Sequence, residues 1–320
     1  MRLTKTSRVA ASVLPACGVG LGGVYLAIRV FPSYSWALFV GTPFLVSFVA
    51  ALLHGWTGPT TWRAAYGIAL LSILLLGALI VCFALDGLIC VLMALPMAVL
   101  VAFPGSAVGY LVGKRLGRGT ACAAAVLVMG AAPGLVAFES HRPATPRLHE
   151  VTTRVEVRAP IQSVWDEVIA FDKIDEPPKG WFRLGIAYPV EARIEGDGPG
   201  ALRYCVFSTG AFLERITRWE APVALEFDVI SNPPPLQELS PWGRIEAPHA
   251  AGAFSAERGV FRLCEANGET VLEGTTWYRQ NMSPGLYWRN ISDLVIHAIH
   301  RRVLEQIKKR AEEKYGRHEQ

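Results

Sequence analysis

The chain has 320 residues, of which 52% are hydrophobic and 18% charged, and its formal net charge is +4. The charges are unevenly spread: the residues before Phe138 include eight lysines and arginines and one acid, Asp86, which leaves 23 basic and 26 acidic residues for the rest. Basic residues around long apolar runs are typical of membrane-protein loops, so this balance does not indicate a nucleic-acid-binding surface. The six cysteines form no CxxC motif and have no regular spacing, and they indicate neither a zinc site nor a disulfide framework.

Long apolar runs fill the first 138 residues and predict a transmembrane region of about five helices. The run Ala64–Leu85 carries no charge over 22 residues, and a helix of that length spans the roughly 30 Å hydrocarbon core of a bilayer. The run that begins at Val9 follows basic residues, but further spans come directly after it, so we interpret it as a retained helix and not as a secretory signal peptide. The predicted spans are residues 9–28, 36–53, 64–85, 88–112 and 121–138.

Basic residues also predict how these spans are oriented. Some lie at the N-terminus, Arg63 precedes the third predicted span, and three more lie at residues 114–118, between the fourth and fifth. With five spans, all these segments fall on one side, which the positive-inside rule assigns to the cytoplasm. We therefore expect a multi-pass protein of a bacterial cell (inner) membrane, with its soluble part outside; one span fewer would place that part in the cytoplasm. The spans contain almost no ionisable residues, which favours an anchor over a transport path.

A linker, residues 139–150, and a soluble domain, residues 151–315, follow the membrane region. Between His149 and Arg158 apolar and charged residues alternate, as in a strand with one buried face. Pro160 then begins a helix with an apolar stripe. Asn267-Gly268 is a strong hairpin signal between the last two strands. The strands predicted after the helix are residues 190–195, 201–208, 212–220, 224–230, 253–265 and 269–280.

The chain ends in a long predicted helix, from Gly285 to about Glu313. We expect His297 and His300 on its solvent-facing side, and the charged last turns, residues 307–314, to project from the domain. The order strand, helix, antiparallel strands and long helix predicts an α+β fold in which a curved sheet wraps the C-terminal helix and leaves a cavity between them. The expected apolar stripe of the helix is Trp288, Ile291, Val295, Ala298 and Ile299.

Three segments of the soluble domain follow one another in an order that is typical of a known superfamily. Residues 155–160, which read VEVRAP, run into the helix sequence VWDEV at residues 164–168; a glycine-bounded pair of strands spans residues 198–210; and the last helix includes residues 293–308. In this order they resemble the START-like (SRPBCC) superfamily, which includes the polyketide cyclase/dehydrase group. The resemblance implies a helix-grip domain with a cavity for a lipid or other hydrophobic small molecule. It does not extend to the membrane region and supplies no catalytic motif, because members of the superfamily share a cavity and not a mechanism.

Aromatic and aliphatic side chains of the strands and of the last helix are the candidates for ligand binding. An aromatic ring with a polar tip suits a pocket that holds an apolar molecule with one polar end. The alternative is that these side chains only close the core between sheet and helix. The predicted ligand-binding residues are Tyr204, Phe227, Phe261, Tyr278, Tyr287, Trp288, Ile291 and Val295.

The ionisable residues of the domain do not form a recognisable catalytic set. Strand alternation favours the outer, solvated face for Glu214, Glu226 and Glu273, so no carboxylate pair can be assigned to the cavity. His297 and His300 have a spacing that can share a metal ion, but no third ligand lies nearby in the sequence. His249 is expected on the surface of a proline-rich loop. We therefore predict no catalytic residue, no metal site and no cofactor.

Three functions fit these patterns. The first is a membrane-anchored binding protein for a lipid or other hydrophobic small molecule. The second is a cyclase or dehydratase-type enzyme that uses the same cavity, which requires at least two ionisable residues inside it. The third is an interaction module without a cavity, whose long helix binds a protein partner.

Overall fold

The computed structural model describes residues 4–30, 34–116, 118–140, 146–245, 250–266 and 268–318. Contacts divide the chain into two compact units. The first consists of Met1–Ala144 together with two short segments from later in the chain, Glu238–His249 and Met282–Gly285. The second contains the remaining residues. Each unit has its own core and is described by itself.

The first unit is built mainly from helices, and four of them are long and apolar enough to cross a membrane. Side-chain caps fix where two of these helices begin, because the hydroxyl of Thr4 accepts from the amide of Ser7 and that of Thr61 accepts from the amide of Ala64. The third helix ends at Cys82, three residues before the end of the predicted span. The helices are α1 Lys5–Tyr25 with the π-helical turn Leu26–Val30, the turn Ala37–Gly41 with α2 Thr42–Trp56, α3 Trp62–Cys82, α4 Leu88–Arg115, and α5 Arg118–Ser140.

Helices α2 and α4 pack closely because α4 has glycines where the two backbones meet. A Cβ atom placed on Gly105 would lie 2.6 Å from the carbonyl oxygen of Phe44, and one on Gly109 would lie 2.3 Å from that of Phe48. Small residues four apart are the usual means by which membrane helices come into close contact. Pro96 and Pro104 lie within α4, which remains one helix across both.

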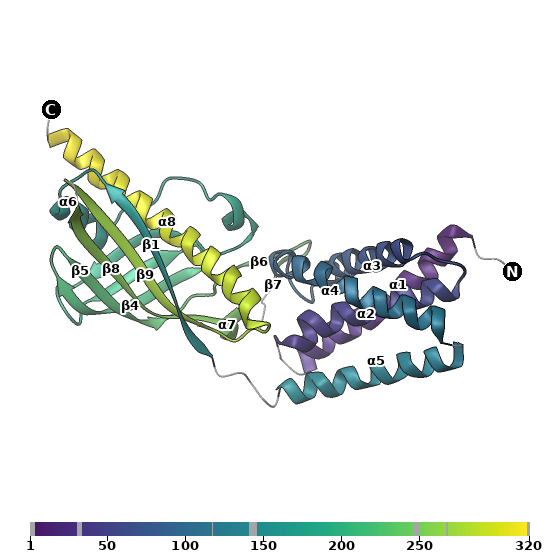
Figure 1. The fold of residues 1–320 in the computed structure, drawn as a ribbon. Coiled ribbons are helices and arrows are strands. Elements are labelled where there is room, and N and C mark those ends of the chain that lie inside the picture. The colour runs from purple at the N-terminus through teal and green to yellow at the C-terminus, as the bar shows by residue number, and fades with distance from the viewer. Residues whose placement is uncertain are drawn as a thin grey trace. The chain divides into compact units, whose positions relative to one another are not determined.

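The second unit is a curled antiparallel half-barrel of seven strands with the long helix α8 lying across it (Figure 1). The strand order is β1-β9-β8-β5-β4-β3-β2, and α6 covers part of the core at one end. This confirms the predicted fold class, a helix-grip domain preceded by long apolar helices. The elements are β1 Arg147–Val157, α6 Ile161–Ile169, a 3₁₀ turn Gly180–Leu184, β2 Pro189–Glu195, β3 Leu202–Phe207, β4 Gly210–Glu220, β5 Ala224–Ser231, α7 Ala250–Ala253, β8 Phe254–Ala266, β9 Glu269–Gln280 and α8 Gly285–His318.

The alternation in β1 has the expected structural consequence. Val151, Thr153 and Val157 are buried, and the residues between them are less so. The strand pairs antiparallel with β9 along its whole length. Strands β8 and β9 form the predicted hairpin, with Ala266 opposite Glu269; Asn267 lies outside the described residues.

Helix α8 begins where predicted, but its buried face is rotated from the expected stripe. Ile291, Val295, Ala298 and Ile299 are half-buried, while the contact with the sheet continues much further along the helix. The prediction that the last turns project is wrong, because the amide of Arg158 donates to Glu312 at 2.8 Å and apolar residues of these turns are buried. The fully packed apolar residues of α8 are Trp288, Ile296, Val303, Leu304, Ile307 and Ala311.

Candidate functional site

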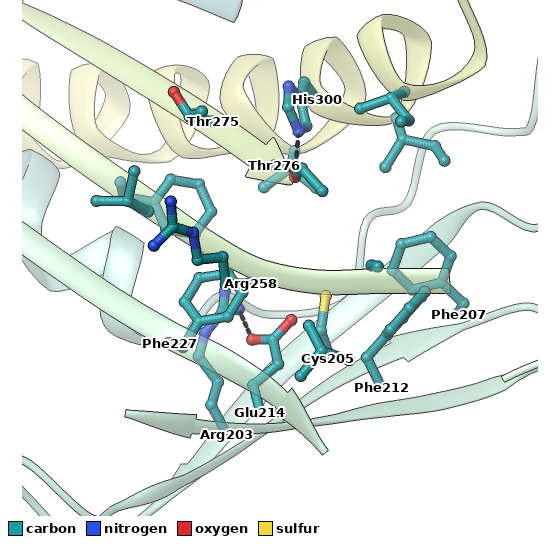
Figure 2. Close-up of a pocket in the computed structure, with 18 of the residues that line it drawn as sticks. Arg203, Cys205, Phe207, Phe212, Glu214, Phe227, Arg258, Thr275, Thr276 and His300 are labelled. Atoms are coloured by element: carbon teal, nitrogen blue, oxygen red, sulfur yellow. Dashed lines mark hydrogen bonds and ion pairs between the residues drawn. The ribbon is translucent and has the colours of Figure 1, made fainter. Parts of the chain in front are cut away.

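A cavity of about 110 Å³ lies between the concave face of the sheet and helix α8 (Figure 2). Its wall is mainly aromatic and aliphatic, but several ionisable groups also line it. Strands β3, β4, β5, β8 and β9 supply one side and α8 the other. The lining residues are Arg203, Cys205, Phe207, Phe212, Glu214, Phe227, Val229, Phe254, Ala256, Arg258, Val260, Phe261, Gly274, Thr275, Thr276, Ile296, Ile299, His300, Val303 and Leu304.

Arg203 and Glu214 form a buried ion pair in the cavity wall. They are direct partners in the antiparallel ladder between β3 and β4, so their side chains leave the sheet on the same face. Arg203 Nη1 donates to Glu214 Oε2 at 2.5 Å, and only 2% and 7% of the two side chains are exposed. Figure 2 shows both side chains reaching into the space between the sheet and α8. The expectation that Glu214 lies on the solvated face is therefore wrong.

The surroundings of Arg203 do not use all of its hydrogen-bond donors. Nε donates to the carbonyl oxygen of Ile169 at 3.3 Å, and Nη1 is taken by Glu214. Nη2 is buried and has no hydrogen-bond partner among the described residues. The guanidinium carbon lies 5.7 Å and 5.5 Å from the ring centres of Phe227 and Phe261, within the range of cation–π attraction. A buried cation with a spare donor is thus held against aromatic rings.

Burial acts on both members of this pair. It raises the pKa of the Glu214 carboxyl, and the neighbouring Arg203 guanidinium opposes that rise. Burial, the largest single effect, lowers the pKa of Arg203, but the opposing effects of Glu214 and Cys205 together outweigh it and raise the pKa above its ordinary value. Arginine is protonated at all physiological pH values, so Arg203 brings a permanent positive charge to the cavity wall.

His300 of α8 also lines the cavity and is tied to the sheet by two threonines. Its Nδ1 lies 3.0 Å from the hydroxyl of Thr153, and its Nε2 lies 2.8 Å from that of Thr276. Burial, followed by the nearby His297, lowers the pKa of His300 to about 4, so its imidazole is neutral at pH 7. His297 contacts the same Thr153 hydroxyl at 2.8 Å. The prediction that both histidines face solvent is wrong, because α8 presents this edge to β1 and β9.

Arg258 marks the more open part of the lining. Its side chain is exposed and its guanidinium lies over the ring of Trp277, 4.1 Å from the ring centre. The other strand glutamates discussed above lie as expected: Glu226 pairs with Arg218 at 3.0 Å, and Glu273 pairs with Arg154. The latter pair is on the outer face of the sheet.

The predicted ligand-binding residues divide into two sets. Phe227 and Phe261 line the cavity. Tyr278 is fully buried, donates to Asp293 at 2.6 Å and belongs to a separate small core cluster with Val151 and Ile296. The other residues are not among those that line this cavity, and their role in ligand binding stays a prediction. The hydroxyl of Tyr204 donates to Glu195 at 3.5 Å, and the rings of Tyr287 and Trp288 meet edge to face. Ile291 and Val295 are half-buried.

The residues that sequence reasoning missed are Arg203, Glu214 and His300. A one-residue shift in strand register turns every side chain to the opposite face. Choosing Tyr204 as an inward residue of β3 therefore excluded its neighbours Arg203 and Cys205, which line the cavity. A signal was present in the alternation Arg203, Cys205, Phe207, each buried, with half-buried residues between them.

Comparison with known proteins gives likenesses in structure only. No protein-family model matches the chain, and no curated protein matches it. Norcoclaurine synthase from Thalictrum flavum is 10% identical over 52% of this chain and 94% of its own, with a TM-score of 0.33. The Aha1 dimer from Colwellia psychrerythraea is 11% identical over 50% and 96%, with a TM-score of 0.29. The di-domain ARO/CYC protein BexL of the BE-7585A biosynthetic pathway is 14% identical over 64% and 63%, with a TM-score of 0.34.

These proteins have the helix-grip fold, and the match lies in the C-terminal half of this chain. The fold itself follows from the architecture described above: seven antiparallel strands in the order β1-β9-β8-β5-β4-β3-β2, with the C-terminal helix α8 against their concave face. The C-terminal half of the chain is therefore a helix-grip domain in its architecture, a curled antiparallel sheet with a long C-terminal helix.

Proposed function

We propose that this chain is a membrane-anchored binding protein for a small hydrophobic molecule that carries one anionic or strongly polar group. The observation that carries the proposal is the spare donor of Arg203 at the wall of an apolar cavity. A buried donor without a partner costs about 1–3 kcal/mol, and a ligand oxygen placed beside it would recover that cost. The apolar wall would hold the rest of the molecule.

The size of the cavity bears on the ligand class. Its volume of about 110 Å³ is somewhat below the roughly 150 Å³ of an engineered apolar cavity that binds benzene. A compact ligand with one ring or a short branched chain suits this space better than a complete lipid. A lipid would have to leave most of its acyl chains outside the cavity or spread the helix from the sheet.

The apolar helices supply the second part of the proposal. Four of them are long and apolar enough to cross a bilayer. We propose that they anchor the domain in the cell membrane, where hydrophobic molecules concentrate. The predicted orientation, with the helix-grip domain outside the cytoplasm, and the bacterial origin belong to this proposal.

The test is to identify what the protein carries. Full-length protein, purified in a mild detergent, is extracted with organic solvent and the extract is analysed by mass spectrometry. The control is the double variant Arg203→Met/Glu214→Leu, which removes both buried charges and leaves the cavity apolar. We expect one compound with an acidic or carbonyl group to be enriched in the wild-type extract and depleted in that of the variant. Equal amounts of the same compounds in both extracts would contradict the proposal.

A second candidate is an enzyme of the cyclase or dehydratase type. The specific observation in its favour is that the cavity contains Glu214 and His300 in addition to Arg203, which meets the requirement for ionisable groups inside it. A neutral imidazole can accept a proton, and a buried carboxyl with a raised pKa can give one. In this case His300→Gln would abolish turnover of the compound found in the extract while its binding persists. Unchanged extract after long incubation with the protein would speak against catalysis.

A further inference from the structure

A small hairpin of the first unit brings an acidic side chain to the start of helix α4. The hairpin consists of β6 Glu238–Ser240 and β7 Gly243–Ile245, which pair antiparallel. Its tip is attached to the end of α3, where the indole nitrogen of Trp242 donates to the carbonyl oxygen of Cys82 at 2.7 Å. The hairpin therefore lies against the turn that joins α3 to α4.

Three ligand-type side chains meet at this turn. Asp86 comes just before the N-cap residue of α4, Cys90 lies in the first turn of that helix, and Glu238 is the first residue of β6. One ligand atom from each lies within 4.8 Å of the others. The thiol of Cys90 donates to Glu238 Oε1 at 2.5 Å, across 148 positions of sequence. Sequence spacing could not reveal such a group, because its third member comes from a distant loop.

The described residues satisfy only one of the two carboxylate oxygens of Glu238. The residue is only 1% exposed, and its Oε2 is buried without a hydrogen-bond partner among the described residues. That oxygen lies directly against Gly87, where an added Cβ would be 1.5 Å from it. A carboxylate oxygen removed from water without a partner is unfavourable by about 1–3 kcal/mol or more. Glycine at position 87 thus makes room for an oxygen that has no donor among the residues with described positions.

The group concentrates acidic side chains in a partly buried place. Its members are two carboxyl groups and a thiol, whose ligand atoms lie within 4.8 Å of one another. Bringing two carboxylates this close together away from water is unfavourable, and a bound cation would remove that cost.

We propose that Asp86, Cys90 and Glu238 bind a divalent cation of the zinc class. A thiolate with two carboxylates suits zinc, whereas magnesium and calcium prefer oxygen ligands alone. The cation would take the free Oε2 of Glu238 as a ligand and replace the proton of the Cys90 thiol. Three protein ligands leave a fourth position for water or another donor. The cation would fasten the β6–β7 hairpin to the turn between α3 and α4.

The test uses the full-length, tag-free protein in detergent, stripped with a chelator and titrated with zinc alone against a chromogenic chelator. We expect one zinc ion per chain. Cys90→Ser and Glu238→Gln should each weaken binding by at least about tenfold, since even residues that only support a ligand have effects of this size. The matched control is Cys82→Ser, because Cys82 is an exposed free cysteine at the end of α3 and outside the group.

Substitution with cobalt keeps the test decisive if a variant misfolds. Cobalt bound to a thiolate gives a near-ultraviolet charge-transfer band, which the wild type and Cys82→Ser should show and Cys90→Ser should lack. Circular dichroism and gel filtration report whether each variant is folded. The proposal is overturned if the wild type binds no stoichiometric zinc, if its cobalt complex has no thiolate band, or if Cys82→Ser weakens binding as much as Cys90→Ser.

Discussion

Two arginine–glutamate pairs in the same sheet have the same local geometry and opposite surroundings. Arg203 and Glu214 are direct partners across β3 and β4, and Arg154 and Glu273 are direct partners across β9 and β1. Both pairs are 2.5 Å apart. The first pair is almost fully buried beside the cavity, whereas 69% of the Arg154 side chain is exposed on the outer face.

The difference shows how burial changes what an ion pair does. On the outer face, water solvates each charge, so the pair contributes little to the stability of the fold. Either partner can therefore be replaced at little cost in stability. Inside the domain, Glu214 is the main counter-charge of Arg203. Removing one member therefore leaves the other as a buried charge without compensation. The buried pair also has a donor to spare, so it can serve a ligand in a way the outer pair cannot.

Breaking the inner pair on one side should have the largest effect. We expect Glu214→Leu to lower the free energy of unfolding of the helix-grip domain by about 3–5 kcal/mol, because the Arg203 charge is then buried without compensation. Thermal unfolding of the full-length protein, followed by tryptophan fluorescence, measures the change. A loss no greater than that of Glu273→Leu would show that Arg203 is solvated and that the cavity wall is not dry.

A pH series sharpens the comparison, since it tests a buried group that has no counter-charge. The pKa of His300 falls from 6.5 to about 4 on folding, so protonation favours the unfolded chain. Above pH 6.5 the free energy of unfolding contains the full contribution of the neutral His300. As the pH falls towards 4 this contribution is lost, and the free energy of unfolding decreases by about 3 kcal/mol in total. His300→Gln should flatten this part of the curve of unfolding free energy against pH. An unchanged slope in the variant would place His300 in contact with water.

Removing both members of the inner pair should be far milder than removing one. In Arg203→Met/Glu214→Leu the buried charges are replaced by apolar side chains of similar size, and we expect a free energy of unfolding within about 1 kcal/mol of the wild type, or above it. The same thermal unfolding measurement applies. If the double variant loses as much free energy of unfolding as Glu214→Leu alone, the pair stabilises the fold by more than the compensation of one charge by the other.

The outer pair should respond least. Glu273→Leu should change the free energy of unfolding by less than about 1 kcal/mol, and the change should shrink further at high salt because the charges are screened. Unfolding at low and high ionic strength tests this expectation. A large, salt-independent loss would mean that the outer face of the sheet is covered in solution.

Much of the fold was predictable because it depends on local pattern. The alternation of Val151, Thr153 and Val157 predicts β1, and the uncharged run that forms α3 predicts a span; the final helix starts at Gly285 as expected. Each of these signals repeats over several residues, so an error at one position does not remove it.

The site depends on single positions and was therefore harder to predict. One residue of register decides whether Tyr204 or Arg203 faces the cavity, and a small rotation of α8 decides whether His300 faces solvent or the sheet. Glu238 comes from an irregular, proline-rich stretch with no periodicity from which its contacts could be derived. Pairing across strands and packing between distant segments are properties of the folded chain, and they choose which ionisable groups become buried.

The most direct test of the account is a calorimetric measurement of two small ligands, benzoate and benzyl alcohol, binding to the full-length protein in detergent, with empty micelles as the blank. The account predicts that the wild type prefers benzoate by tenfold or more, because a charge-assisted hydrogen bond to the spare donor of Arg203 contributes about 1.5–3 kcal/mol. Arg203→Met/Glu214→Leu should lose this preference and retain benzyl alcohol, while Arg154→Met/Glu273→Leu should behave as the wild type. Equal affinity of the wild type for both ligands, or a preference that survives in the inner double variant, would contradict the central claim.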